Sequence, residues 1–188
     1  MKKIITLAIV SFLMLSACSQ KSQSSDNENN KNNANNTVEF RSPKGDIIAV
    51  CTVNGTDTTW VINNALGEPL MPDCEHIEVA TNDNGQPKEA YFHHKGIITV
   101  ITFWENMEKM AEGDLKDGLR NGLWTGYDMN TGKKMSETDF TAGVENGSYV
   151  VYNENGTPSI VGQYKDGEKT GTWTFYDRDG NRVGTQKF

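Results

Sequence analysis

The sequence lacks the motifs on which most enzymes depend. Its 188 residues contain no G-x-S-x-G, no phosphate-cradling glycine loop and no Ser–His–Asp order that would pair a nucleophile with its base. The glycines stand mainly at turn positions after Asn or Asp, and carboxylate pairs such as Asp177 and Asp179 also fall in turns. We therefore predict that the protein is not an enzyme. A hydrolase with a dispersed site is the remaining catalytic alternative.

Positive charge is also scarce. The chain carries 18 lysines and arginines against 25 aspartates and glutamates. Removing Lys2 and Lys3 with the leader described below leaves 16 basic residues, so the mature chain has a net charge near −9. A field of this sign repels the phosphates of nucleic acids and anionic membrane surfaces. The sequence thus argues against a nucleic-acid partner and favours a role for the charge in keeping the surface hydrated.

Cysteine and histidine are too few and too poorly spaced for a metal centre. The chain has three of each, and both C-x-x-C and H-x-x-x-H are absent. The nearest approach to a ligand set is Cys74, Glu75, His76, His93 and His94. Adjacent residues of a strand point to opposite faces, so His93 and His94 cannot both reach one ion. We predict no metal and no cofactor.

No apolar run reaches transmembrane length. The best candidate, Ile4–Leu15, is short and follows the positive start Lys2–Lys3, as in a secretion signal. The stretch Leu-Ser-Ala-Cys that ends at Cys18 is a lipobox. We expect residues 1–17 to be a lipoprotein signal peptide and the Cys18 thiol to carry the lipid anchor. An ordinary secretory signal with an incidental cysteine is the alternative.

Residues 18–37 consist of the lipidated cysteine and an Asn/Ser-rich tether. Such a composition cannot bury enough apolar surface to offset the entropy of ordering, so we expect it to be disordered. As a flexible coil the tether spans about 25 Å root-mean-square. Ser19, not the Asp of an inner-membrane retention signal, follows Cys18. We expect a lipid-anchored protein of the cell envelope in the outer membrane of a Gram-negative bacterium, facing either the periplasm or the outside.

Two cysteines remain for a disulfide. Cys51 and Cys74 flank a predicted hairpin around Trp60–Gly67, and an exported protein meets conditions in which disulfides form. A Cys51–Cys74 bond would close a loop of about 23 residues and contribute about 3 kcal/mol by the loop-entropy estimate. The alternative is two buried thiols.

What the chain does contain is a repeat. Three copies begin at Gly118, Gly143 and Gly167, in steps of 25 and 24 residues. They read GLRNGLWTGYD, GVENGSYVVYN and GEKTGTWTFYD. Each copy has a second glycine four residues after the first, then an aromatic residue, then a tyrosine. A fixed period of this length is the signature of a repeat array.

Turn chemistry divides each copy into strands. Asn155–Gly156, Asp166–Gly167 and Asp179–Gly180 are dipeptides that accept the positive φ of a tight hairpin. Pro158 is expected at the start of a strand, where its missing N–H costs least. Turns recur at the roughly 8–12-residue spacing of all-β proteins. The sequence therefore predicts an elongated antiparallel meander of β-hairpin repeats.

The side-chain alternation of a strand sorts the repeated aromatic residues onto two faces. One ladder is expected to supply core aromatics: Trp124, Tyr149 and Trp173. The other ladder is the candidate binding surface: Tyr127, Tyr152 and Tyr176. Exposed tyrosines on a sheet suit stacking on sugars or anchoring a protein partner. The sequence leaves open which of the two ladders is buried.

The repeat resembles the MORN-repeat family, in the variant form of bacterial secreted and lipid-anchored proteins. The pattern G-x-x-x-G-x-W-x-x-Y-(D/N)-x-x-G matches from Gly167 to Gly180, whereas the Gly143 copy has Tyr149 in place of Trp. The copy at Gly118 has one extra residue before Gly132. The resemblance implies a twisted sheet of hairpins used as a binding or scaffolding surface, without catalytic residues. Some members of the family are labelled antitoxin-like, and no motif here supports that role.

The folded domain is predicted over residues 38–188, with clear repeats at 113–188 and degenerate repeats at 50–112. Within the degenerate part, Gly96–Trp104 is the most apolar run of the mature chain and is expected to be a buried strand in the middle of the sheet. Residues 105–112 are expected to form a strand or loop, with a short helix as the alternative.

Together these features predict a lipid-anchored cell-envelope protein with a non-catalytic repeat domain. Its expected role is to present a protein-binding or scaffolding surface to an envelope protein. The alternative is a glycan-binding module for peptidoglycan or a surface polysaccharide. A protein-binding surface should expose an apolar patch rimmed by charge, a glycan-binding surface should expose flat rings, and an enzyme should have a deep pocket with convergent titratable groups.

Overall fold

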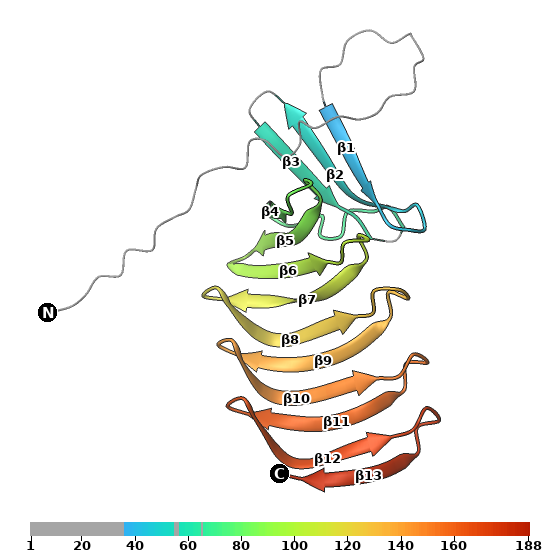
Figure 1. The fold of residues 1–188 in the computed structure, drawn as a ribbon. Helices are drawn as coiled ribbons and strands as arrows, with labels where there is room; N and C mark the ends of the chain where they lie inside the picture. The colour runs from blue at the N-terminus through green and yellow to red at the C-terminus, as the bar shows by residue number, and fades with distance from the viewer. Residues whose placement is uncertain (1–35, 55–56, 65) are drawn as a thin grey trace, which may run out of the picture.

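The computed structural model describes residues 36–54, 57–64 and 66–188, so the predicted signal peptide and Cys18 lie outside it. Within these ranges the chain is all-β, with thirteen antiparallel strands and no helix. It follows that these residues contain no helix able to cross a membrane. The strands pair in sequence order (Figure 1), which confirms the predicted antiparallel β-meander.

Two sheets make up the fold. The smaller sheet has three strands, β1 (Asn36–Arg41), β2 (Ile47–Asn54) and β3 (Asp57–Ile62). The longer sheet has ten strands: β4 (His76–Thr81), β5 (Pro87–His94), β6 (Ile97–Phe103), β7 (Lys109–Lys116), β8 (Leu119–Tyr127), β9 (Lys134–Thr141), β10 (Val144–Tyr152), β11 (Pro158–Lys165), β12 (Glu168–Tyr176) and β13 (Arg182–Lys187). The small sheet lies at the β4 end of the long sheet (Figure 1).

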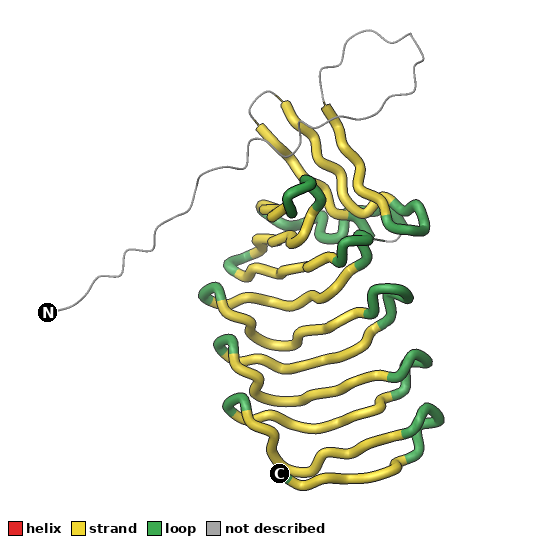
Figure 2. The backbone as a smooth tube through the Cα atoms, viewed as in Figure 1, coloured by secondary structure: helices red, strands yellow, loops and turns green. Residues whose placement is uncertain are grey.

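Tight turns connect the strands along one long side of the ten-stranded sheet, which we call the tight-turn edge, and longer turns connect them along the opposite side (Figure 2). The tight turns are two-residue hairpins such as Asp166–Gly167, whose φ angles of 52° and 83° are both positive. Such a turn matches the twist of the flanking strands, and glycine reaches its second position without steric cost. This explains why each repeat opens on a glycine. The other tight turns are Lys95–Gly96, Asp117–Gly118 and Ala142–Gly143.

The longer turns are joined to one another by side-chain hydrogen bonds, which we call the turn ladder. In each bond, a side-chain N–H of one turn donates to a backbone carbonyl of the next turn along the sheet. The bonds run from Asn106 Nδ2 to Met129 O, from Lys133 Nζ to Glu154 O and from Asn155 Nδ2 to Arg178 O, at 2.9, 2.9 and 2.6 Å. The turn ladder therefore ties this edge together repeat by repeat.

One of the longer turns has an additional residue. Asp128 N donates to the carbonyl of Lys133, whereas the corresponding bond of the next turn joins Asn153 N to the carbonyl of Thr157. This difference accounts for the step of 25 residues between the first two copies against 24 between the next two. Because the extra residue lies in a turn, the strands on either side keep the same side chains on the same faces.

The hydrophobic core lies between the two sheets. Phe92 of β5 and Ile101 of β6 are almost fully buried, and Ala49 and Ile62 of the small sheet belong to the same cluster. The cluster is completed by Ala90, Phe103 and Met107, with half-buried residues such as Phe40, Trp60 and Cys74 packed around it. A buried Phe or Ile side chain contributes about 1.5–3 kcal/mol, so apolar stabilisation is concentrated at this end of the molecule.

The small sheet departs from the expected array. Of the residues predicted to be degenerate repeats, 76–112 include strands of the long sheet, whereas residues 50–62 belong to the separate sheet. The apolar strand β6 is the third strand from one end of the long sheet, not a central one, and the small sheet covers one of its faces. Residues 104–108 form a turn and β7 begins at Lys109, so residues 105–112 contain no helix.

Candidate functional site

The cross-strand register separates two faces of the long sheet. Trp124 lies opposite Thr138, which in turn lies opposite Tyr149, so both rings belong to one face. Tyr149 also contacts Trp173, with ring centroids 5.3 Å apart. We call this the tryptophan face. The opposite face carries Tyr127, Tyr152 and Tyr176, and we call it the tyrosine face.

On the tryptophan face, each Trp ring lies over a glycine of the preceding strand. A Cβ atom added to Gly162 would come within 2.3 Å of the Trp173 ring, and one on Gly113 would come within 2.4 Å of the Trp124 ring. Only glycine allows so close an approach. Trp173 is 2% exposed and Trp124 is 7% exposed, although nothing in the described chain covers this face with a second layer. Tyr149, which lies opposite Gly162, is half-buried.

Basic side chains cover these rings from the solvent side. The Arg120 guanidinium lies 4.5 Å from the centre of the Trp124 ring, and Lys169 Nζ lies 4.4 Å from the centre of the Trp173 ring. The middle repeat has Glu145 at the corresponding position. The basic side chains place their aliphatic stems on apolar surface and their charges against π-electrons. They substitute for the missing second layer.

On the tyrosine face, two of the three predicted hydroxyls are bound by carboxylates. The Tyr127 hydroxyl donates to Glu112, and the Tyr152 hydroxyl donates to Glu137. The hydrogen bond to Glu137 raises the pKa of Tyr152 to about 12. Burial, followed by the bond to Glu112, raises the pKa of Tyr127. Both tyrosines therefore stay neutral and serve as internal donors.

The charge of each carboxylate is balanced by a lysine three residues earlier. Lys109 Nζ lies 2.8 Å from Glu112 and 4.4 Å from the centre of the Tyr127 ring. Lys134 pairs with Glu137 in the second copy, and this bond, followed by that from Tyr152, lowers the pKa of Glu137. Contacts within the fold therefore already occupy the hydroxyl groups of two of the three tyrosines in the predicted binding surface.

The third tyrosine differs from the other two. Tyr176 is half-buried on β12, and its position relative to the neighbouring strand corresponds to that of Tyr127 and Tyr152. Val161 stands where the other copies have Glu112 and Glu137. The structure therefore places the three tyrosines in one row on one face, but in two chemical environments.

The tight-turn edge carries an apolar stripe that the sequence reasoning missed. Ile97, Leu119 and Val144 each follow a turn glycine and are 49%, 48% and 45% exposed. A Cβ on Gly143 would lie 3.4 Å from Leu119, and one on Gly167 would lie 3.4 Å from Val144, so these two side chains pack against the next tight turn, whereas a Cβ on Gly118 would meet no atom of Ile97 within 4 Å. The sequence did contain a signal for this stripe. An aliphatic residue directly follows the glycine of three of the tight turns, whereas Glu168 follows the glycine of the fourth.

Next to Leu119, the tryptophan face is hollowed. A hollow of about 420 Å³ is lined by residues that include Tyr91 of β5, Val100 of β6 and Leu119, Arg120 and Trp124 of β8. Among the described residues Arg120 has no ion-pair partner. Leu119 belongs both to the stripe and to the lining of the hollow, so it connects the exposed aliphatic residues with the aromatic walls and with a guanidinium that has no ion-pair partner. We call this combination of stripe and hollow the edge site.

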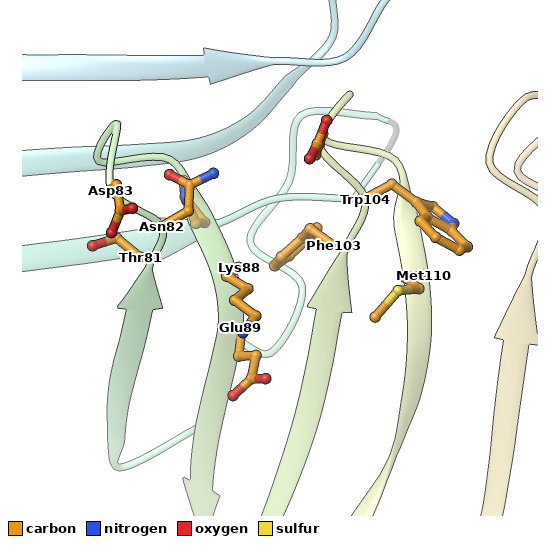
Figure 3. A pocket seen from close by; sticks show the side chains of 10 residues that line it. Thr81, Asn82, Asp83, Lys88, Glu89, Phe103, Trp104 and Met110 are labelled. Atoms are coloured by element: carbon orange, nitrogen blue, oxygen red, sulfur yellow. The ribbon is translucent and has the colours of Figure 1, made fainter.

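A second hollow, of about 500 Å³, opens toward the longer turns (Figure 3). It lies between the turns at 82–86 and 104–108, and its lining includes Phe103, Trp104 and Met110. Glu89 borders both hollows. Glu89 also accepts a hydrogen bond from the Tyr91 hydroxyl, which raises the pKa of Tyr91 to about 12.

The histidines of the candidate ligand set lie on β4 and β5, whereas Cys51 lies on β2. His76 and His93 lie opposite each other, with their Nε2 atoms 3.6 and 3.5 Å from Glu78 Oε1. The part of the chain that the structure covers contains no group of three such side chains that could hold a metal ion. Cys51 is buried in β2 opposite Trp60, and Cys74 is half-buried before β4. No disulfide joins the two cysteines in this structure.

The chain was also compared with known protein families and with curated proteins. No protein-family model matches the chain, and no curated protein matches it.

Proposed function

We propose that this protein is a lipid-anchored component of the cell envelope whose hairpin-repeat domain binds a protein partner and has no catalytic role. The observation that carries the proposal is the edge site. Ile97, Leu119 and Val144 are exposed apolar side chains at successive tight turns, and Leu119 borders the hollow next to the charged side chain of Arg120. Exposed apolar patches rimmed by polar residues are typical of protein interfaces.

Two further observations support a protein partner over a glycan. Sugar stacking needs a flat, accessible ring, but Arg120 and Lys169 cover the rings of Trp124 and Trp173. The hydroxyls of Tyr127 and Tyr152 already donate to carboxylates. The anchor at Cys18 rests on the lipobox, and the scaffolding role rests on the resemblance to MORN-variant repeats.

The proposal is tested by affinity capture from detergent-solubilised envelope with the full chain as bait. We expect a protein to be captured by the parent chain and lost with the double variant Leu119→Ser/Val144→Ser, because the apolar patch is removed. Val183→Ser is the matched control, since Val183 is 65% exposed but lies on β13, away from the edge site. Thermal unfolding of each variant checks that the fold is kept.

Two results would overturn the proposal. Equal capture by parent and double variant would remove the edge site from the function. Capture that disappears after peptidoglycan digestion would move the function to glycan binding.

A further inference from the structure

The second hollow marks a gap in the turn ladder. From the turn at 104–108 onward, each longer turn is bonded to the next, beginning with Asn106 Nδ2 and the carbonyl of Met129. In the described chain no hydrogen bond joins the turn at 82–86 to that at 104–108. The hollow of about 500 Å³ occupies this interval. Between the other longer turns a side-chain hydrogen bond crosses the interval, whereas here the interval contains the hollow.

The walls of the hollow combine apolar and acidic groups. Phe103, Trp104 and Met110 supply apolar and aromatic surface on the side of β6 and β7 (Figure 3). Trp104 is held in place because its Nε1 donates to the carbonyl of Tyr127 at 3.2 Å. This bond fixes the indole of Trp104, which is one of the residues that line the hollow.

Three carboxylates border the same space. Asp83, Glu89 and Glu105 line it together with a single basic residue, Lys88. Within the described ranges none of these four side chains takes part in an ion pair. The hollow therefore carries an excess of negative charge next to an aromatic ring, and the whole mature chain adds a negative field of the same sign.

We propose that this hollow binds an arginine side chain presented by a partner protein. A guanidinium combines flat stacking on an indole with paired N–H donors that suit carboxylates. Its aliphatic stem fits against Met110 and Phe103. This site is distinct from the stripe of the edge site, and a short peptide tests it without any envelope partner.

The test is a titration of the ¹⁵N-labelled full chain, followed by the NMR signal of the Trp104 indole N–H. The probes are acetyl-Gly-Arg-Gly-amide and the same peptide with citrulline, which has nearly the shape of arginine but no charge. We expect a saturable shift with the arginine peptide and at least tenfold weaker binding of the citrulline peptide. Raising the salt concentration should weaken the arginine complex, because the attraction is electrostatic.

Variants separate the local site from the overall charge. Asp83→Asn/Glu105→Gln should weaken arginine binding several-fold, and Lys88→Gln should strengthen it. The matched control is Glu154→Gln/Asp179→Asn, which removes two charges from exposed turns that do not line the hollow. It should leave binding almost unchanged. The proposal is overturned by equal affinity for both peptides, by equal losses in the two double variants, or by no saturable shift with either peptide.

Discussion

The two ends of the long sheet are stabilised in different ways. At β4–β6 a second sheet covers one face, and the buried side chains form an ordinary two-layer core around Phe92 and Ile101. From β8 to β13 nothing in the described chain covers either face. There, Trp rings lie over glycines, basic side chains lie over the rings, and the turn ladder joins one edge.

The comparison shows what a single-layer sheet needs. Trp173 is as well buried as the best core residues, although only neighbouring strands surround it. The closeness comes from Gly162, which lets the ring lie flat on the strand. The open part of the sheet thus buries its Trp rings against glycines of the neighbouring strands, whereas the covered end buries its side chains against the small sheet.

The largest expected effect is at the covered end. Phe92→Ala should lower the free energy of unfolding by about 3–5 kcal/mol, because it leaves a cavity in a two-layer core. Chemical denaturation followed by circular dichroism measures the change. If the loss stayed below about 1 kcal/mol, the idea that apolar stabilisation is concentrated between the two sheets would be wrong.

A smaller effect is expected in the open region. Gly162→Ala should cost about 1–3 kcal/mol, because its Cβ would overlap the Trp173 ring and displace it. Gly184→Ala is the matched control, since a Cβ there would meet its nearest atom, in Phe175, at an ordinary 3.9 Å. Denaturation of both variants, with tryptophan fluorescence as the probe, decides the matter. Similar losses in both would contradict the ring-over-glycine explanation.

The smallest effect concerns the tyrosine face. Tyr152→Phe removes the hydrogen bond to Glu137 and should cost about 1 kcal/mol at pH 7. Tyr176→Phe removes the same hydroxyl where Val161 replaces the carboxylate, and should cost less. Equilibrium unfolding at fixed pH compares the two variants. A larger loss for Tyr176→Phe would show that the carboxylates are not what distinguishes the two environments.

The same bond predicts a pH dependence. The folded state raises the pKa of Tyr152 from 10.0 to about 12, so it holds the proton more tightly than the unfolded chain does. The stabilisation is therefore complete below pH 10 and is lost as the pH rises to about 12. The difference between the parent and Tyr152→Phe should shrink over this range. A constant difference would mean that the hydroxyl contributes by packing alone.

The hairpins could be predicted from sequence because their signals are local. Dipeptides such as Asp166–Gly167 specify positive φ at both positions, and Pro158 does begin β11. Alternation along each strand also assigned the repeated aromatics to opposite faces. These features depend on a few neighbouring residues.

Other features depend on contacts between distant segments. That β2 leaves the array and packs on β5 and β6 cannot be read from its own pattern, since Ala49 and Phe92 are far apart in the chain. The ring-over-glycine contact did leave a signal, which the sequence reasoning overlooked. Gly113 and Gly162 each precede their Trp by 11 residues, and Thr138 precedes Tyr149 by the same interval.

For the candidate site, sequence identified the tyrosine row but not how it is used. The carboxylate partners Glu112 and Glu137 each precede their tyrosine by 15 residues. The apolar stripe was missed because an exposed aliphatic residue next to a turn has no signature of its own. Its meaning comes from its alignment across three hairpins.

The extra residue in the turn at Asp128–Lys133 has a consequence for how such a protein can change. An insertion within a strand would move every following side chain to the opposite face. An insertion in a longer turn leaves both faces as they were, and this chain already contains one. The longer turns are therefore the places where new segments, including a reporter or an epitope, can be added without rebuilding the domain.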